Sequence, residues 1–187
     1  MSTSRRCGLV VMGCLAGFAS GSAAQSAQKL SIQGSGAVLF ATRKDPTYDS
    51  KIRLGYEGQA RYTFGRFSLG AGYQRSTVFA FTNNPLTLAL SFVFLEPRYV
   101  AAAGSGVALY LAGRAGAGKI VCSTSGECPP QDYQLGFGGG GGLLFRLSNR
   151  VSADLGGQFF QAPALSGPSG KFSSGYAMVR GGLSLGL

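Results

Sequence analysis

The segment from Lys51 to Phe64 alternates between apolar and polar side chains with a period of two residues. Its apolar side chains are Ile52, Leu54, Tyr56, Ala60, Tyr62 and Phe64, and its polar side chains are Lys51, Arg53, Glu57, Gln59, Arg61 and Thr63. This pattern predicts a β-strand with one apolar face and one polar face. At about 3.3 Å per residue, such a strand is long enough to cross a bilayer at a tilt.

Seven further segments alternate in the same way, which makes eight predicted strands. The others are Leu30–Thr42, Phe67–Ser76, Thr87–Tyr99, Val107–Ala117, Tyr133–Arg146, Val151–Phe160 and Tyr176–Leu187. The pattern is least regular in Thr87–Tyr99. There the apolar Leu90, Phe92 and Phe94 fall on the same face as Glu96 and Arg98, so the register of this strand stays open.

The predicted connections alternate between short and long. The short ones are Gly65–Arg66, Val100–Gly106 and Leu147–Arg150, and the long ones are Arg43–Ser50, Thr77–Leu86, Gly118–Asp132 and Gln161–Gly175. Alternating lengths and an even strand number are typical of a membrane barrel with tight periplasmic turns and longer external loops. The sequence therefore predicts an all-β fold, an eight-stranded antiparallel up-and-down transmembrane β-barrel with both termini in the periplasm.

Alternation alone does not say which face lies inside, because a soluble barrel of the lipocalin type would bury the apolar face. Here the polar face is built largely from Gly, Ser, Ala and Gln, and charged residues are only 13% of the chain. Such a face suits a narrow lumen filled by side chains better than a solvated exterior. The apolar face would then meet lipid. Aromatic residues near strand ends would form an interfacial girdle, namely Tyr62, Phe64, Phe67, Tyr99 and Phe145.

The first 24 residues have the three parts of a secretory signal peptide. Arg5 and Arg6 give a positive start, Gly8–Ala19 is an apolar run, and Ser22–Ala24 is a small-residue site with cleavage expected after Ala24. The apolar run is shorter than the roughly 20 residues that a spanning helix needs. We therefore predict one barrel domain at 25–187, which follows the cleaved signal at 1–24.

Two cysteines remain after cleavage, Cys122 and Cys128, in a polar predicted loop. In an exported protein, two cysteines this close are most simply a disulfide. A metal site is the rival interpretation, but two thiolates fall short of the usual four ligands and the chain has no histidine. We predict the disulfide, with no metal and no cofactor.

The last strand ends in Gly181–Leu187, with Gly182, Leu185 and the terminal Leu187 at spaced positions. This segment is similar to the C-terminal signal that the barrel assembly machinery reads, although that signal favours a terminal Phe. With the eight alternating strands, the chain resembles the small eight-stranded outer-membrane barrels of the OmpA and OmpX type. The resemblance implies an integral outer-membrane protein in contact with lipid and lipopolysaccharide.

The predicted polar face carries six arginines and three acids. They are Arg53, Arg61, Arg98, Arg114, Arg146 and Arg180, with Glu57, Glu96 and Asp154. If this face is the lumen, we expect an ion-pair network that fills the barrel, because buried charges must be paired. The functional alternative is a weakly anion-selective passage.

The chain has 17 Lys and Arg against 7 Asp and Glu. The basic residues form no run, which disfavours nucleic acid as a partner. Lipopolysaccharide phosphates are a better match, and the candidate contacts are Arg43, Lys44, Lys119 and Lys171. These residues are equally interpretable as ordinary solvated loop charges.

Enzymes of this barrel class would need a histidine beside a nucleophile or carboxylate, and the chain has none. The sequence therefore favours a non-enzymatic, monomeric protein with a structural or surface-interaction role. A small, mostly closed, weakly anion-preferring channel is the alternative, and a lipid-modifying enzyme is a distant third.

Overall fold

The computed structural model of this chain describes residues 29–41, 53–81, 84–122, 132–161, 165–167, 170–172 and 175–187. The predicted signal peptide lies outside these residues. In the described part, no helix is long and apolar enough to cross a membrane.

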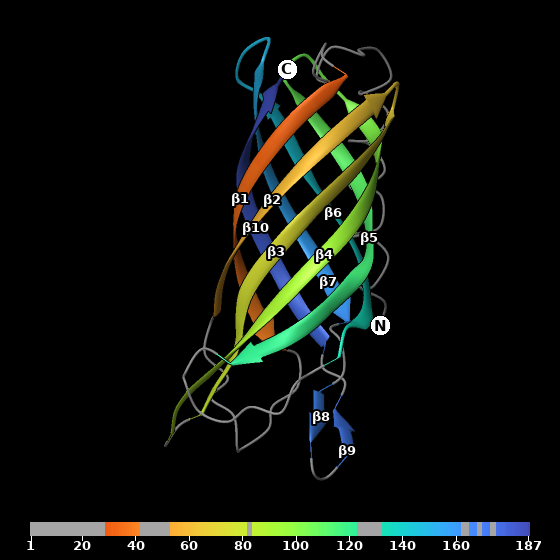
Figure 1. Cartoon of the computed structure of the whole chain (residues 1–187). Coiled ribbons are helices and arrows are strands. Elements are labelled where there is room, and N and C mark those ends of the chain that lie inside the picture. Colours follow the sequence, from red (N-terminus) through yellow and green to blue (C-terminus); the bar gives the residue numbers. More distant parts are fainter. Residues whose placement is uncertain are drawn as a thin grey trace, which may run out of the picture.

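Eight antiparallel strands close into one barrel, which confirms the predicted fold class (Figure 1). The strands are β1 (Leu30–Ala41), β2 (Arg53–Phe64), β3 (Phe67–Phe81), β4 (Asn84–Ala103), β5 (Val107–Cys122), β6 (Gln134–Arg146), β7 (Val151–Gln161) and β10 (Gly175–Gly186). Strands adjacent in the barrel follow one another along the chain, and β10 pairs with β1 to complete the circle. Two short strands, β8 (Leu165–Gly167) and β9 (Gly170–Phe172), form a separate hairpin between β7 and β10.

The strands β3 and β4 are longer than the sequence pattern predicted. Thr77–Leu86 was expected to be a long loop, but β3 continues to Phe81 and β4 begins at Asn84, with these two residues paired. The ladder shifts register between Thr77 and Phe79 and again between Ala80 and Phe81. Irregularities of this kind break the period of two on which the prediction depended. β-Branched and aromatic residues nevertheless keep the segment extended.

Three short turns lie at one end of the barrel, which we call the short-turn end. Gly65 begins a two-residue hairpin with φ of 62°, a backbone conformation that favours glycine in this position. In the β6–β7 turn, the Ser148 hydroxyl accepts hydrogen bonds from the backbone N–H groups of Arg150 and Val151. Leu187 N donates to Leu30 O at 2.9 Å, so both described ends of the chain lie here as well. The opposite end is called the long-loop end.

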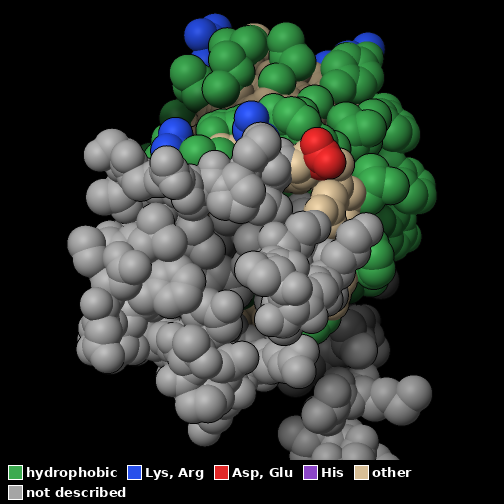
Figure 2. Space-filling view, turned by 60° about the horizontal axis from the view of Figure 1, so that its bottom comes forward, with side chains coloured by type: hydrophobic (Ala, Val, Ile, Leu, Met, Phe, Trp, Pro, Cys, Tyr) green, Lys and Arg blue, Asp and Glu red, His purple; other side chains and the backbone are tan. Residues whose placement is uncertain are grey.

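The barrel wall is apolar outside, as the alternation predicted. On β2, Leu54 is 70% exposed and Tyr56 59%, whereas Glu57 and Gln59 on the opposite face are each 4% exposed. Figure 2 shows hydrophobic side chains over the visible wall. At the short-turn end four of the five predicted girdle residues, all except Phe145, form a continuous row, in which Phe67 and Tyr99 have ring centroids 4.9 Å apart. The neighbouring rings of the row are Tyr62 and Phe64.

Candidate functional site

Charged side chains from five strands meet in the middle of the lumen. They are Glu57 and Arg61 of β2, Glu96 and Arg98 of β4, Arg114 of β5, Asp154 of β7 and Arg180 of β10. None of these residues is more than 6% exposed. Each strand presents alternate residues to the lumen, odd-numbered ones on β1 and β2 and even-numbered ones on the other six barrel strands, because successive side chains point to opposite faces of a sheet. We call this set of seven side chains the charge layer.

Glu96 is the centre of the charge layer, because its carboxylate contacts four arginines. The distances are 2.8 Å to Arg61 Nη2, 2.8 Å to Arg98 Nε and 2.7 Å to Arg180 Nη1, and Arg114 Nη2 is also bound. Gln158 adds a neutral donor, from Nε2 to Glu96 Oε2 at 3.1 Å. A carboxylate can remain charged in a buried site when donors saturate its oxygens in this way.

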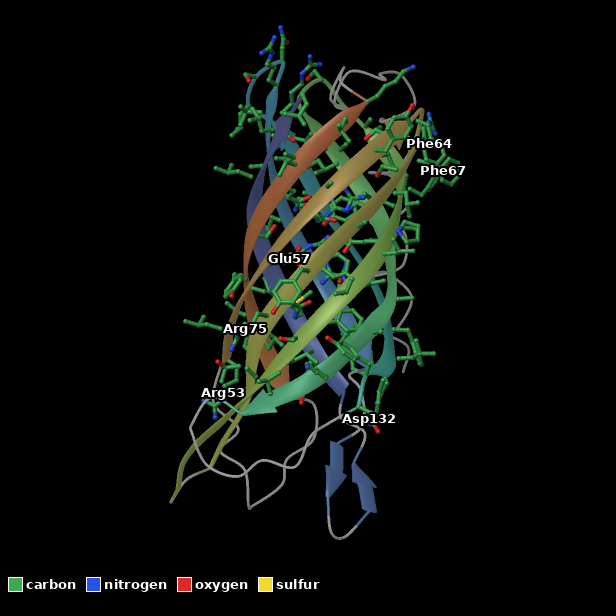
Figure 3. The ribbon with its side chains drawn as sticks, viewed as in Figure 1. Arg53, Glu57, Phe64, Phe67, Arg75 and Asp132 are labelled. Atoms are coloured by element: carbon green, nitrogen blue, oxygen red, sulfur yellow. The ribbon has the colours of Figure 1, made fainter. Side chains whose placement is uncertain are left out.

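Most of the ion pairs connect strands that are not neighbours; the exceptions are Arg98–Glu96 within β4 and Arg114–Glu96 between the adjacent β5 and β4. Glu96 and Arg180 stand on β4 and β10, which are four places apart in the closed order of eight strands and therefore face each other across the lumen. Arg114 bridges Glu96 and Glu57, and its Nη1 lies 2.8 Å from Glu57 Oε2. Figure 3 marks Glu57 on the barrel between its two ends. The charge layer thus braces the barrel across its diameter.

Asp154 extends the charge layer toward the short-turn end. It pairs with Arg98 and accepts hydrogen bonds from Tyr110 OH at 2.7 Å and from Gln33 Nε2 at 3.1 Å. The Arg98 guanidinium also lies over the Tyr110 ring, 4.4 Å from its centroid. Beyond it, Val100 and Ala108 pack with Tyr110 in a small buried apolar cluster. These contacts leave a cavity of only about 50 Å³ at this end of the lumen.

The lumen toward the long-loop end is lined mainly by apolar side chains, with the buried Gln74 and Ser76 among them, which corrects the expectation of a polar interior throughout. All five even-numbered residues from Leu90 to Arg98 point inward, so the open register of β4 is resolved with its apolar side chains inside. Phe92 and Phe160 meet edge to face, with ring centroids 4.8 Å apart. The buried apolar layer consists of Leu39, Leu90, Phe92, Phe94, Phe160, Tyr176 and Met178. Arg114 of the charge layer contacts this apolar layer, because its Cζ atom lies over the Phe94 ring, 3.8 Å from the ring centroid.

The other predicted lumen arginines lie nearer the ends of the barrel. Arg53, the first residue of β2, is half-buried. Arg146 is half-buried at the last position of β6 and donates to Asn149 Oδ1 at 3.0 Å in the adjoining turn. Both face the lumen by the parity of their strands, and neither belongs to the charge layer as defined above.

The remaining predicted site residues are mostly beyond the described part of the chain. Cys128, Arg43 and Lys44 lie outside the described residues, and the side chains of Cys122 and Lys171 are likewise not described. Lys119 is described: it is half-buried, and its Nζ is 5.1 Å from the Tyr133 ring centroid. In the part that the structure describes, no group of three His, Cys, Asp or Glu side chains could hold a metal ion.

Several neutral residues of the site were missed by the sequence analysis. Gln33, Gln74 and Gln158 bind the charge layer, and Tyr110 orients Asp154. All four occupy the alternate positions that face the lumen on their strands, and this alternation is the sequence signal that could have identified them. What the parity does not give is the partner of each side chain across the lumen.

No protein-family model matches the sequence, and no curated protein sequence matches it. Solved structures do match the fold. Neisserial surface protein A is 14% identical, covers 85% of this chain and 97% of its own, and has a TM-score of 0.70. Ail of Yersinia pestis, at 16% identity, covers 83% of this chain and 96% of its own with a TM-score of 0.48. The N-terminal barrel domain of Pseudomonas aeruginosa OprF, at 13% identity, covers 84% and 98% with a TM-score of 0.45. The chain therefore has the fold of the small eight-stranded outer-membrane β-barrels.

Proposed function

We propose that this protein is a monomeric, non-enzymatic outer-membrane barrel with a structural or surface-interaction role. The observation that carries the proposal is the filled lumen. The Arg180–Glu96 pair spans its diameter, and the apolar layer occupies it between this pair and the long-loop end. An eight-stranded barrel has room for side chains and little else. Such a protein serves the envelope through its wall and its loops rather than through a pore.

The apolar wall and the barrel topology support an integral location in the outer membrane. In this orientation both termini and the short turns are periplasmic, and the connections at the long-loop end face outward. Strand β10, which closes the barrel against β1, is the segment we propose for recognition by the barrel assembly machinery. The loop cations and the wall are the candidate contacts for lipopolysaccharide.

One observation favours a second function, a small anion-preferring channel. The charge layer holds four arginines and three carboxylates, which is an excess of one positive charge. A passage lined in this way would admit anions before cations. The close ion pairs argue against it, because an ion would have to displace a guanidinium from its carboxylate.

Two measurements test the proposal together. The purified wild-type protein, folded into a planar bilayer beside a large porin as positive control, should give no steady conductance. Cells that lack the gene should keep their uptake of small anionic solutes and lose detergent resistance, serum resistance or adhesion. Large, stable, anion-selective channels, together with reduced uptake in the deletion strain, would make transport the function instead.

A further inference from the structure

Two cations stand on the described part of the outer wall of the barrel, where the other outward-facing residues are uncharged. Arg75 of β3 and Lys119 of β5 are the only charged residues among the outward-facing positions that the structure describes on the eight barrel strands. Neither forms an ion pair with a carboxylate in the described ranges. A lipid-facing cation destabilises a barrel by about 2–4 kcal/mol at the bilayer midplane and by close to nothing at the interface. The depth of the two residues in the bilayer therefore decides whether they can be tolerated.

Their height places them near the interface at the long-loop end. Arg75 follows the girdle residue Phe67 by eight positions on β3, which is about 27 Å along a strand. At the usual tilt this is about 20 Å of the roughly 25 Å apolar band. Figure 3 places Arg75 toward the long-loop end and Phe64 and Phe67 at the opposite end.

The two cations belong to one row of paired residues. Arg75 pairs with Ser91 of β4, and Ser91 pairs with Lys119 of β5. Two strand spacings separate the cations by about 10 Å between Cα atoms. Two long side chains can approach one anion between them when the Lys119 ammonium turns from the Tyr133 ring, 5.1 Å away on the other side of β5, toward Ser91. Ser91 lies in the middle of the row, and its hydroxyl is hydrogen-bonded to Tyr73 OH at 3.0 Å.

The wall beside Arg75 is hollowed. An open hollow of about 320 Å³ is lined by Arg75 together with Leu54, Tyr56 and Ala89. Apolar lining with a cation at its edge suits an amphiphile that has an anionic headgroup and hydrocarbon chains. Tyrosines at this level, Tyr56, Tyr73 and Tyr133, also have the amphipathic rings that favour a membrane interface.

We propose that Arg75 and Lys119 bind a phosphate group of lipid A, the phosphorylated glycolipid anchor of lipopolysaccharide, in the outer leaflet. The guanidinium and the ammonium supply charge-assisted hydrogen bonds. The Ser91–Tyr73 hydroxyl pair supplies one further donor, because one of its two protons is used in the bond between them, and the hollow receives the adjoining apolar part. This inference rests on the proposed function, because it requires the long-loop end to face the outer leaflet.

The test uses the full mature chain folded in detergent micelles and titrated with lipid A. A ligand that binds only the folded state raises the temperature at which the barrel unfolds, which unboiled and heated samples report by their electrophoretic mobility. The test variant is Arg75→Gln/Lys119→Gln. The matched control is Arg66→Gln/Arg150→Gln, which removes two exposed cations from the short turns at the other end. Dephosphorylated lipid A and phosphatidylglycerol are the comparison lipids.

Lipid A should stabilise the wild type and the control variant, and its apparent affinity for the Arg75/Lys119 variant should fall at least tenfold. Dephosphorylated lipid A should stabilise none of them. Equal stabilisation of the test variant by lipid A, or equal stabilisation of the wild type by phosphatidylglycerol, would overturn the proposal. A barrel that unfolds at the same temperature with and without lipid A would overturn the lipid site while the proposed function stands. A chain that never folds in micelles would contradict the proposed function itself.

Discussion

The guanidinium of Arg180 forms a two-pronged contact with the carboxylate of Glu96, from Nη1 to Oε2 at 2.7 Å and from Nη2 to Oε1 at 2.9 Å. The two residues are 84 positions apart in the chain and stand on opposite walls of the barrel. Paired donors in a planar fork fix the orientation of both groups as well as their distance. The pair therefore ties the last strand of the barrel to a strand near the middle of the chain.

Glu96→Gln should destabilise the barrel by about 3–5 kcal/mol, because it leaves four buried arginines around a neutral amide. Urea unfolding in micelles, followed by the mobility shift between unboiled and boiled samples, measures the loss. Asp132→Asn is the matched control, since it removes an exposed acid, and its effect should be within about 0.5 kcal/mol. A Glu96→Gln barrel as stable as the control would show that the charge layer does not support the fold.

Arg61→Met should cost less than Glu96→Gln, about 1–3 kcal/mol. The charge layer has one cation more than it has carboxylates, so removal of Arg61 leaves three of each. Glu96 would keep three arginine partners, while Gln59 Oε1 would lose its donor. The same urea series measures both variants, and a larger loss for Arg61→Met than for Glu96→Gln would refute the excess-charge explanation.

The inward and outward positions of most strands could be predicted from sequence, because a period of two is a local property. Leu54 and Glu57 were assigned to the correct faces from their neighbours alone. Strand β4 was ambiguous because Phe92 and Glu96 share a face, and only the ladders on both sides of β4 decide it. The alternation within a single strand does not predict that the lumen changes from charged to aromatic along the barrel.

The set of charged residues in the site was also predictable, whereas their pairing was not. Inward parity brought Glu57, Glu96 and Asp154 together with the arginines. Which arginine meets which carboxylate depends on strand tilt and on the stagger between β10 and β4, which are properties of the closed barrel. Lys119 was predicted as a lipopolysaccharide contact, but as a loop residue and without Arg75. The row that the two residues share appears only when the registers of three strands are combined.

Gly65→Ala should destabilise the barrel by about 1–2 kcal/mol, because its positive φ is unfavourable for a residue with a Cβ atom. Gly106→Ala is the control: a Cβ at Gly106 meets nothing within 4 Å, and its φ lies outside the positive region. Unfolding free energies of the two variants give the comparison. Equal losses would mean that the turn conformation is not the cause.

Cys122 and Cys128 should be joined in the exported protein, and the bond should matter little for the barrel. The ring they close is small, so the chain-entropy gain is at most about 2–3 kcal/mol. Alkylation of the unfolded, non-reduced protein followed by intact-mass measurement should detect no free thiol. Two alkylated cysteines in the mature chain would disprove the bond.

The central claim is that the apolar wall of this eight-stranded barrel faces lipid, and cell fractionation combined with electrophoresis tests it most directly. The mature protein should be recovered from the outer-membrane fraction, resist carbonate extraction, and migrate differently in dodecyl sulfate before and after boiling. Recovery as a soluble monomer from the periplasm, with the same mobility in both samples, would contradict the claim.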